Sequence, residues 1–173
     1  MNTTKIFGIN SLTLYPITAD SVSAYTLGAP VELTGAKSLE VSFTIEEKAL
    51  TGAEIILDTL VKVKKLNFTA TFARLAFEAL ATVLNGTVTA DEASLQMGEN
   101  PPYFKLVATT EGTDAGTLEL HLMKCKLTAI PLKLSENDFT TFSLSGVGIF
   151  TTHKFEKGEK EASMLMNVIF EEA

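Results

Sequence analysis

Two histidines and a single cysteine are the residues of this chain best suited to metal binding or nucleophilic chemistry. His121 falls on the polar side of an alternating run, and His153 lies near the expected end of a strand. The chain has no H-E-x-x-H pattern and no paired cysteines, which are spacings that hold zinc or redox centres. Cys125 lies in the alternating run 117–128 and is predicted to be a buried, unreactive thiol. We therefore expect no metal site and no cofactor.

The motifs that usually mark an enzyme are also missing from the sequence. There is no G-x-S-x-G elbow, no P-loop and no G-x-G-x-x-G turn. Adjacent carboxylates such as Glu46 and Glu47 point to opposite faces of a strand, so their adjacency does not make an acid–base pair. Gly146 and Gly148 fall inside a strand pattern, which predicts a bulge or a close backbone approach. The sequence therefore predicts a protein that is not an enzyme.

The charge balance is acidic, with 21 carboxylates against 14 basic residues and a net charge of −7. Every basic residue except Arg74 is a lysine. Because arginine is the side chain that best grips phosphate groups, this composition argues against tight binding of nucleic acid. Lys62, Lys64 and Lys65 form a cluster without interleaved aromatic residues. We interpret this cluster as a surface that forms salt bridges with another subunit.

In most segments of the sequence, apolar and polar residues alternate with period two, which is typical of half-buried β-strands. Leu39, Val41, Phe43 and Ile45 alternate with polar residues, and this apolar side is expected to lie on the core. A single domain is predicted over residues 1–173, because the length and the 46% hydrophobic content suit one substantial core. Further strands are predicted at 5–14, 54–63, 65–71, 103–110, 117–128, 139–150 and 163–170.

One segment follows a helical period instead of the strand period. Apolar residues recur there at the i, i+3, i+4, i+7 spacing: Phe72, Leu75, Ala76, Ala79, Leu80, Val83 and Leu84. The following Asn85-Gly86 can supply the left-handed stop. The predicted fold class is mainly β, a two-sheet β-sandwich or partly closed barrel with one flanking α-helix at about 72–84.

The order of these elements resembles that of the tail tube (major tail) proteins of long-tailed bacteriophages. The strand that ends at Ile45, the charged segment 46–53 and the strand after it look like the extended hairpin of that family. The other elements follow in the family's order: a short strand at 66–71, the single helix, the step 85–89, and terminal strands at 139–150 and 163–170. The resemblance covers residues 6 to 172 and is one of order and pattern, without an invariant motif.

This resemblance implies a structural virion protein that self-assembles into hexameric rings, which stack into the tail tube and give DNA a channel into the host. The implied partners are the chain itself, the tail initiator, the tape measure protein and the terminator. Phage DNA passes transiently without specific binding, and no membrane is involved. The implied location is the phage virion, after assembly in the host cytoplasm. Related inner-tube proteins of contractile tails and secretion systems stay open as an alternative.

Two groups of residues are expected to matter for such an assembly. The charged segment is predicted to be a mobile loop between subunits or rings, through Glu46, Glu47, Lys48, Leu50 and Gly52. The polar sides of two strands are candidates for the channel lining or, equally, for the outer wall, through Glu40, Ser42, Thr44, Glu119 and His121. A function of another class, a soluble ligand-binding β-barrel, also fits the alternation and predicts a monomer with an apolar cavity.

Overall fold

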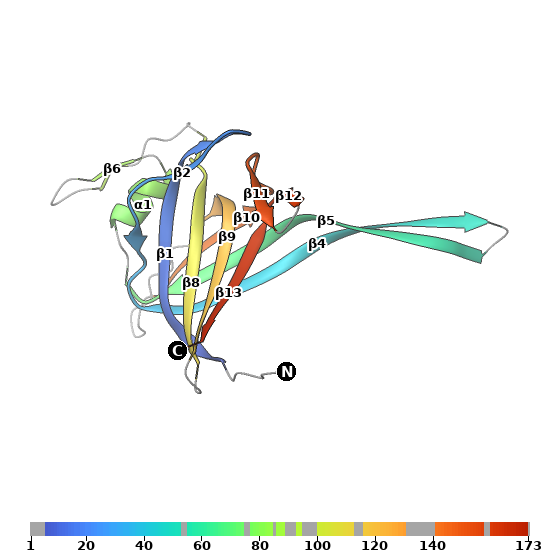
Figure 1. Cartoon of the computed structure of the whole chain (residues 1–173). Helices are drawn as coiled ribbons and strands as arrows, with labels where there is room; N and C mark the ends of the chain where they lie inside the picture. The colour runs from blue at the N-terminus through green and yellow to red at the C-terminus, as the bar shows by residue number, and fades with distance from the viewer. Residues whose placement is uncertain are drawn as a thin grey trace.

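Long antiparallel strands make up most of the structure, with one short helix beside them (Figure 1). The computed structural model describes residues 6–52, 55–74, 77–84, 86–88, 93–94, 100–112, 116–130, 141–157 and 160–172. The strands are β1 (Ile6–Asp20), β2 (Tyr25–Leu27), β3 (Val31–Glu32), β4 (Ala36–Gly52), β5 (Ile55–Phe72), β6 (Thr87–Val88), β7 (Ala93–Ser94), β8 (Phe104–Gly112), β9 (Gly116–Ala129), β10 (Phe142–Gly148), β11 (Lys154–Lys157), β12 (Lys160–Ser163) and β13 (Met166–Glu172). Within the described residues the one helix is α1 (Phe77–Leu84). The prediction of a mainly β chain with a single helix is confirmed.

Nine of the strands form one antiparallel sheet in the order β2-β1-β8-β9-β10-β5-β4, with β13 paired to β9 and β3 paired to β1. The pairs β11–β12 and β6–β7 form two small separate sheets. The expected two facing sheets are thus one continuous sheet that curls but does not close. Strand twist and the register shifts in β1, β4 and β9 allow this curvature. Leu12 of β1 and Val41 of β4, near opposite ends of the order, consequently pack on the same core.

The core is lined by the apolar side of each main strand, as a sheet with one covered face requires. α1 closes part of this core, because Ala79 and Val83 are fully covered there and the helix contacts β1, β3 and β9. The buried core side chains are Leu12, Leu14, Leu33, Leu66, Phe68, Ala70, Phe72, Ala79, Val83, Phe104, Leu106, Ala108, Leu122, Cys125, Leu127, Leu144 and Leu165.

The helix begins later than its apolar spacing predicts. Phe72 is the last residue of β5, where it pairs with Ala36 and Phe142 and is buried. Its ring stacks on that of Phe142 with centroids 6.0 Å apart. Strand pairing and this contact hold the residue extended, so tertiary packing overrides the local helical period. The predicted helix residues Leu75 and Ala76 and the predicted stop at Asn85 lie outside the described residues.

β4 and β5 form a hairpin whose distal half projects from the body as a two-stranded ribbon (Figure 1). β10 pairs with β5 only along Leu66–Phe72. We call residues 43–52 and 55–65, which have only each other as described strand partners, the ribbon. At about 3.3 Å per residue, its β4 side is roughly 30 Å long.

The predicted loop at 46–53 is wrong for the part that the structure describes. Residues 46–52 are paired strand, from Glu46 opposite Lys62 to Gly52 opposite Ile55. Residues 53–54, between β4 and β5, lie outside the described residues. The two strands predicted at 54–63 and 65–71 are likewise one strand, since a register shift opposite Thr44 and Ile45 carries the pairing through Lys64. Continuous cross-strand pairing satisfies the backbone groups and keeps the charged segment extended.

Candidate assembly surface

The predicted channel-lining residues all lie on the sheet face opposite the core. On β4, Glu40 and Ser42 are exposed, while the alternating Leu39 and Val41 pack against the core. On β9, Glu119 and His121 alternate with Leu120 and Leu122 in the same way. The two sets are not neighbours, because β5 and β10 lie between β4 and β9. They therefore belong to one face but to two separate parts of it.

The part near β4 is a belt of hydroxyl and amide side chains. Asn67 donates from Nδ2 to Thr44 Oγ1 over 3.0 Å. Thr69 Oγ1 and Ser145 Oγ lie 3.2 Å apart. These side-chain contacts link β4, β5 and β10 in addition to the backbone hydrogen bonds between the strands. We call the following residues the hydroxyl belt: Ser42, Thr44, Asn67, Thr69, Thr71, Ser143 and Ser145.

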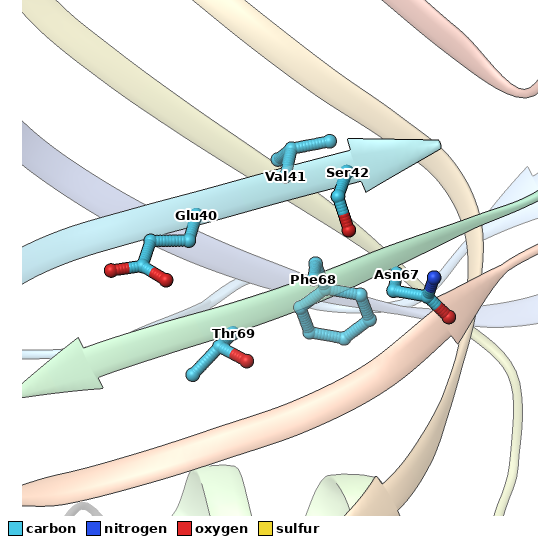
Figure 2. A pocket seen from close by; sticks show the side chains of 6 residues that line it. All are labelled: Glu40, Val41, Ser42, Asn67, Phe68 and Thr69. Atoms are coloured by element: carbon cyan, nitrogen blue, oxygen red, sulfur yellow. The ribbon is translucent and has the colours of Figure 1, made fainter. Parts of the chain in front are cut away.

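A shallow groove runs between β4 and β5 within this belt. Figure 2 shows Glu40 and Ser42 on the same side of β4, with Val41 pointing to the opposite side. The groove has a volume of about 210 Å³, whereas small-molecule pockets hold roughly 300–1,000 Å³. It has no nucleophile paired with a base. Its lining is Glu40, Val41, Ser42, Asn67, Phe68 and Thr69. The groove offers a polar, weakly acidic surface rather than a catalytic centre.

The part of the polar face near β9 carries a histidine–carboxylate pair. His121 Nε2 and Glu119 Oε2 are 2.7 Å apart, and the two side chains are largely covered. Lys105, on the neighbouring strand β8, is half-buried. Burial lowers the pKa of its ammonium group, and the charge of Glu119 partly opposes that shift. The geometry orders two side chains of β9 on this face. Glu119 is consequently less free than Glu40 to meet a passing ligand.

The root of the ribbon carries opposite charges on its two strands. β4 contributes Glu46 and Glu47, and β5 contributes Lys62, Lys64 and Lys65. Lys64 Nζ and Glu46 Oε2 form an ion pair of 3.0 Å with both side chains solvent-accessible. The other three are exposed. Lys48, Leu50 and Gly52, the other residues predicted to mediate assembly, lie further along β4, where the structure describes only the backbone pairing.

An exposed apolar surface lies where the ribbon leaves the body. The prediction that the apolar side of 38–45 rests on the core is wrong for Phe43 and Ile45, which are 45% and 56% exposed. The core ends near the last residue of β10, Gly148, which pairs with Leu66. β4 and β5 continue past that point with the same alternation. We call the exposed and groove-lining apolar residues at this junction the apolar strip: Phe43, Ile45, Val61, Val63, Phe150, Met164, Met166 and Val168.

The apolar strip borders a groove at a fork in the sheet. β10 and β13 both pair with β9, at Cys125–Ala129 and at Gly116–Leu122, so they follow one another along the same edge of β9. β5 runs beside β10 and then diverges with the ribbon, which opens the fork (Figure 1). The groove is lined by Phe43, Val63, Phe150, Ser163, Met164, Leu165 and Met166. Six of these seven lining residues are apolar.

A buried carboxylate that the sequence did not reveal fixes the other side of the fork. Asp20 accepts hydrogen bonds from the backbone N–H groups of Thr152 and His153, at 2.9 and 2.8 Å, and from Lys124 Nζ at 2.5 Å. Burial by itself raises the pKa of this carboxyl, but the hydrogen bonds outweigh it and lower the pKa to about 2. No local motif marks Asp20, because its partners lie more than a hundred residues away in the chain.

The remaining residues singled out by type have structural roles. Cys125 is a fully buried free thiol, as predicted, and burial raises its pKa. The ring of His153 packs edge-on against Phe155 with centroids 4.9 Å apart. In the described part of the chain, no group of three or more His, Cys, Asp or Glu side chains could hold a metal ion. Among the described helical residues, no helix is long and apolar enough to cross a membrane.

No protein-family model matches the chain, and no curated protein shows significant sequence similarity to it. The ribbon, the apolar strip and the polar face are the features of the molecule that bear on its function.

Proposed function

We propose that this protein is a structural, non-enzymatic virion component that self-assembles into stacked hexameric rings and forms a phage tail tube for DNA delivery. In this proposal its main partner is a further copy of itself. The tail initiator, the tape measure protein and the terminator bind at the ends or interior of the tube, and DNA passes through without specific binding. The inner-tube proteins of contractile tails and secretion systems share the same assembly logic.

The observation that carries this proposal is the apolar strip at the base of a projecting ribbon. Phe43, Ile45, Val61 and Val168 are each about half exposed or more, although their strands alternate as if for a core. A contiguous apolar surface of this kind usually marks a protein–protein contact. None of the described strands pairs with the outer edges of the ribbon, and such edges invite strand pairing with another chain. Contact with a further copy would bury the exposed apolar side chains and pair the free strand edges.

The geometry favours assembly over ligand binding. A ligand-binding barrel encloses its ligand in a closed sheet, whereas the sheet formed by the described strands is open, with β2 and β4 at the ends of its order. The groove at the fork opens to solvent, and it is bordered by edges of β5 and β13 that have no partner there among the described strands. Such a surface fits an extended protein segment better than a small molecule.

The test is whether the apolar strip drives assembly. Phe43→Ser combined with Ile45→Ser should leave the fold intact and abolish rings and tubes, because both side chains are exposed in the isolated chain. Wild-type protein should form rings or tubes when concentrated or nucleated. Sedimentation velocity and negative-stain electron microscopy measure both outcomes. Val22→Ser is the matched control, since Val22 is 74% exposed and does not belong to the apolar strip.

A wild-type chain that stays monomeric at millimolar concentration, and forms no tubes on a tail initiator, contradicts the proposal. Normal tubes from the Phe43/Ile45 variant would remove the apolar strip from the mechanism. Near-UV and far-UV circular dichroism verify that the variant has kept the native fold.

A further inference from the structure

We propose that the ribbons of neighbouring copies pair edge to edge, with the acidic β4 edge of one copy placed against the lysine-rich β5 edge of the next. This inference rests on the proposed self-assembly and names the contact that sets its direction. It follows from the free edges, the charge distribution and the apolar strip, which are three separate features of the ribbon.

Both long edges of the ribbon lack a described strand partner. β4 pairs only with β5. β5 has a second partner, β10, along Leu66–Phe72 and none of the described strands along residues 55–65. The two edges lie on opposite sides of one ribbon. Each carries free backbone N–H and C=O groups, so the edge of one copy can form hydrogen bonds with the opposite edge of another copy. Repeating this contact gives a heterologous, head-to-tail interface, which closes into a ring or extends into a filament.

The strand directions suit this arrangement. β4 and β5 are antiparallel within one copy. In a cyclic assembly the ribbons point the same way relative to the ring axis, so the β4 strand of one copy runs antiparallel to β5 of its neighbour. The sheet β4-β5-β4-β5 is then antiparallel throughout, with the backbone hydrogen bonds of such a ladder.

Charge selects this pairing over the alternatives. The β4 side of the ribbon carries Glu46, Glu47 and Lys48, a net charge of −1, and the β5 side carries Asp58, Lys62, Lys64 and Lys65, a net charge of +2. β4 against β5 brings opposite charges together, whereas β4 against β4 or β5 against β5 brings like charges together. Opposite-charge neighbours across strands are stabilising and like charges are destabilising. The ribbon therefore disfavours the two-fold dimers that would end growth.

The same contact covers the apolar strip. The β5 edge faces the fork, whose floor includes Phe150, Met164 and Met166. A strand added to that edge runs over this floor and brings its own Phe43 and Ile45 to it. The apolar area supplies the attraction, and the charges decide which edges meet.

Paired charge reversals test the inference. One variant carries Glu46→Lys and Glu47→Lys, so both of its ribbon edges are basic. The other carries Lys62→Glu and Lys65→Glu, which makes the β5 side mainly acidic. Each alone should raise the concentration needed for assembly at least about tenfold, since like charges then meet in every contact. An equimolar mixture should assemble close to the wild-type concentration, with the two variants alternating. Sedimentation velocity and electron microscopy give the readout.

The mixture separates contacts between copies from damage within one ribbon. The Lys64–Glu46 ion pair belongs to a single chain, so mixing cannot repair a ribbon that has failed internally. The control reversals Glu32→Lys with Glu156→Lys, and Lys37→Glu with Lys154→Glu, place the same charge changes on exposed residues outside the ribbon. They should assemble like the wild type.

Two results overturn the inference alone: unchanged assembly of each ribbon variant, or a mixture that stays as inactive as its components while the wild type assembles. A chain with all four substitutions, which exchanges the two edges, provides a second check and should assemble by itself. A wild-type chain that never assembles overturns the proposed function, and this inference with it.

Discussion

Asp20 shows how a single side chain can hold distant parts of this fold together. Its side chain is only 6% exposed, and that of its partner Lys124 is 11% exposed. Two backbone N–H groups from the segment between β10 and β11 point at the same carboxylate. Tyr25, five residues further along the chain, donates its hydroxyl to the backbone oxygen of Met123 and so anchors the same corner. The corner joins β1 and β2 to the segment that leads into β13.

Asp20→Asn should lower the free energy of unfolding at pH 7 by about 2 kcal/mol or more. The shift of the Asp20 pKa from 3.8 to about 2 corresponds to that magnitude at about 1.4 kcal/mol per unit. Because the folded-state pKa is depressed, this stability is present above about pH 4 and is lost as the pH falls towards 2. Urea unfolding at pH 7 and pH 2.5 measures both values.

The difference between wild type and Asp20→Asn should therefore shrink at the lower pH. Glu32→Gln, at an exposed position, serves as the control and should change the free energy of unfolding little at either pH. An equal loss for Asp20→Asn at both pH values would contradict the ionic role of this carboxylate.

Gly146 is the second residue with an outsized effect on the fold. A Cβ at this position would lie 2.5 Å from the Lys126 carbonyl oxygen and 2.6 Å from the Phe68 ring. The register of β10 against β9 also shifts between Ser145 and Gly146. The predicted bulge and close approach are both confirmed here.

Gly146→Ala should destabilise the protein by about 2–3 kcal/mol, because neither the Lys126 backbone nor the buried Phe68 ring can move away easily. Gly148→Ala is the matched comparison. Its nearest contact would be 3.2 Å, to the flexible end of Leu66, so a smaller loss is expected. Thermal unfolding of the two variants ranks them, and equal losses would show that the close approach at Gly146 does not matter.

At the scale of elements, alternation predicted most strands but not what covers them. The apolar residues 39, 41, 43 and 45 follow one pattern, yet Leu39 and Val41 meet the core and Phe43 does not. The difference arises where β10 ends, and sequence period carries no information about the length of a neighbouring strand. The helix prediction at Phe72 was wrong for a related reason, because pairing with β4 and β10 overrides the helical spacing of this residue.

The candidate site was predictable in its polar half and not in its apolar half. Polar positions such as Glu40 and Ser42 follow directly from the strand period. The charged segment 46–52 was expected to be a loop because its composition resembles one, but pairing with β5 holds it extended. Asp20 could not be found at all, because its role depends on contacts with β9 and the segment after β10.

At the scale of the whole molecule, the polar face is the candidate wall of a channel. If the sheet faces the lumen, the hydroxyl belt offers hydrogen-bonding side chains without cationic ones, and Glu40 adds negative charge. The belt residues and Glu40 offer no cationic group to phosphates, so this part of the face lets DNA pass.

Glu40→Lys should therefore leave tubes intact and slow DNA ejection, with the delay relieved by added salt. Glu40 is a better test position than Glu119, which His121 and Lys105 already engage. Glu32→Lys, at an exposed position on β3 outside the hydroxyl belt, is the control for net charge. Ejection from well-formed Glu40→Lys tubes at the wild-type rate would place this face on the outside of the tube.

The strand pairing of the sheet also determines the order in which the parts of a newly synthesised chain can fold. The ribbon joins strands adjacent in sequence, with Gly52 opposite Ile55, and hairpins form within about 1–10 μs. The body forms later, because its strands are far apart in the sequence. β1 pairs with β8 through contacts such as Leu14 with Leu106, and β9 pairs with β13, which follows it by more than thirty residues. Such high contact order slows folding. During synthesis on the ribosome, the adhesive ribbon is thus expected to exist before the body that carries it, which makes nascent chains on one messenger the most exposed to premature association.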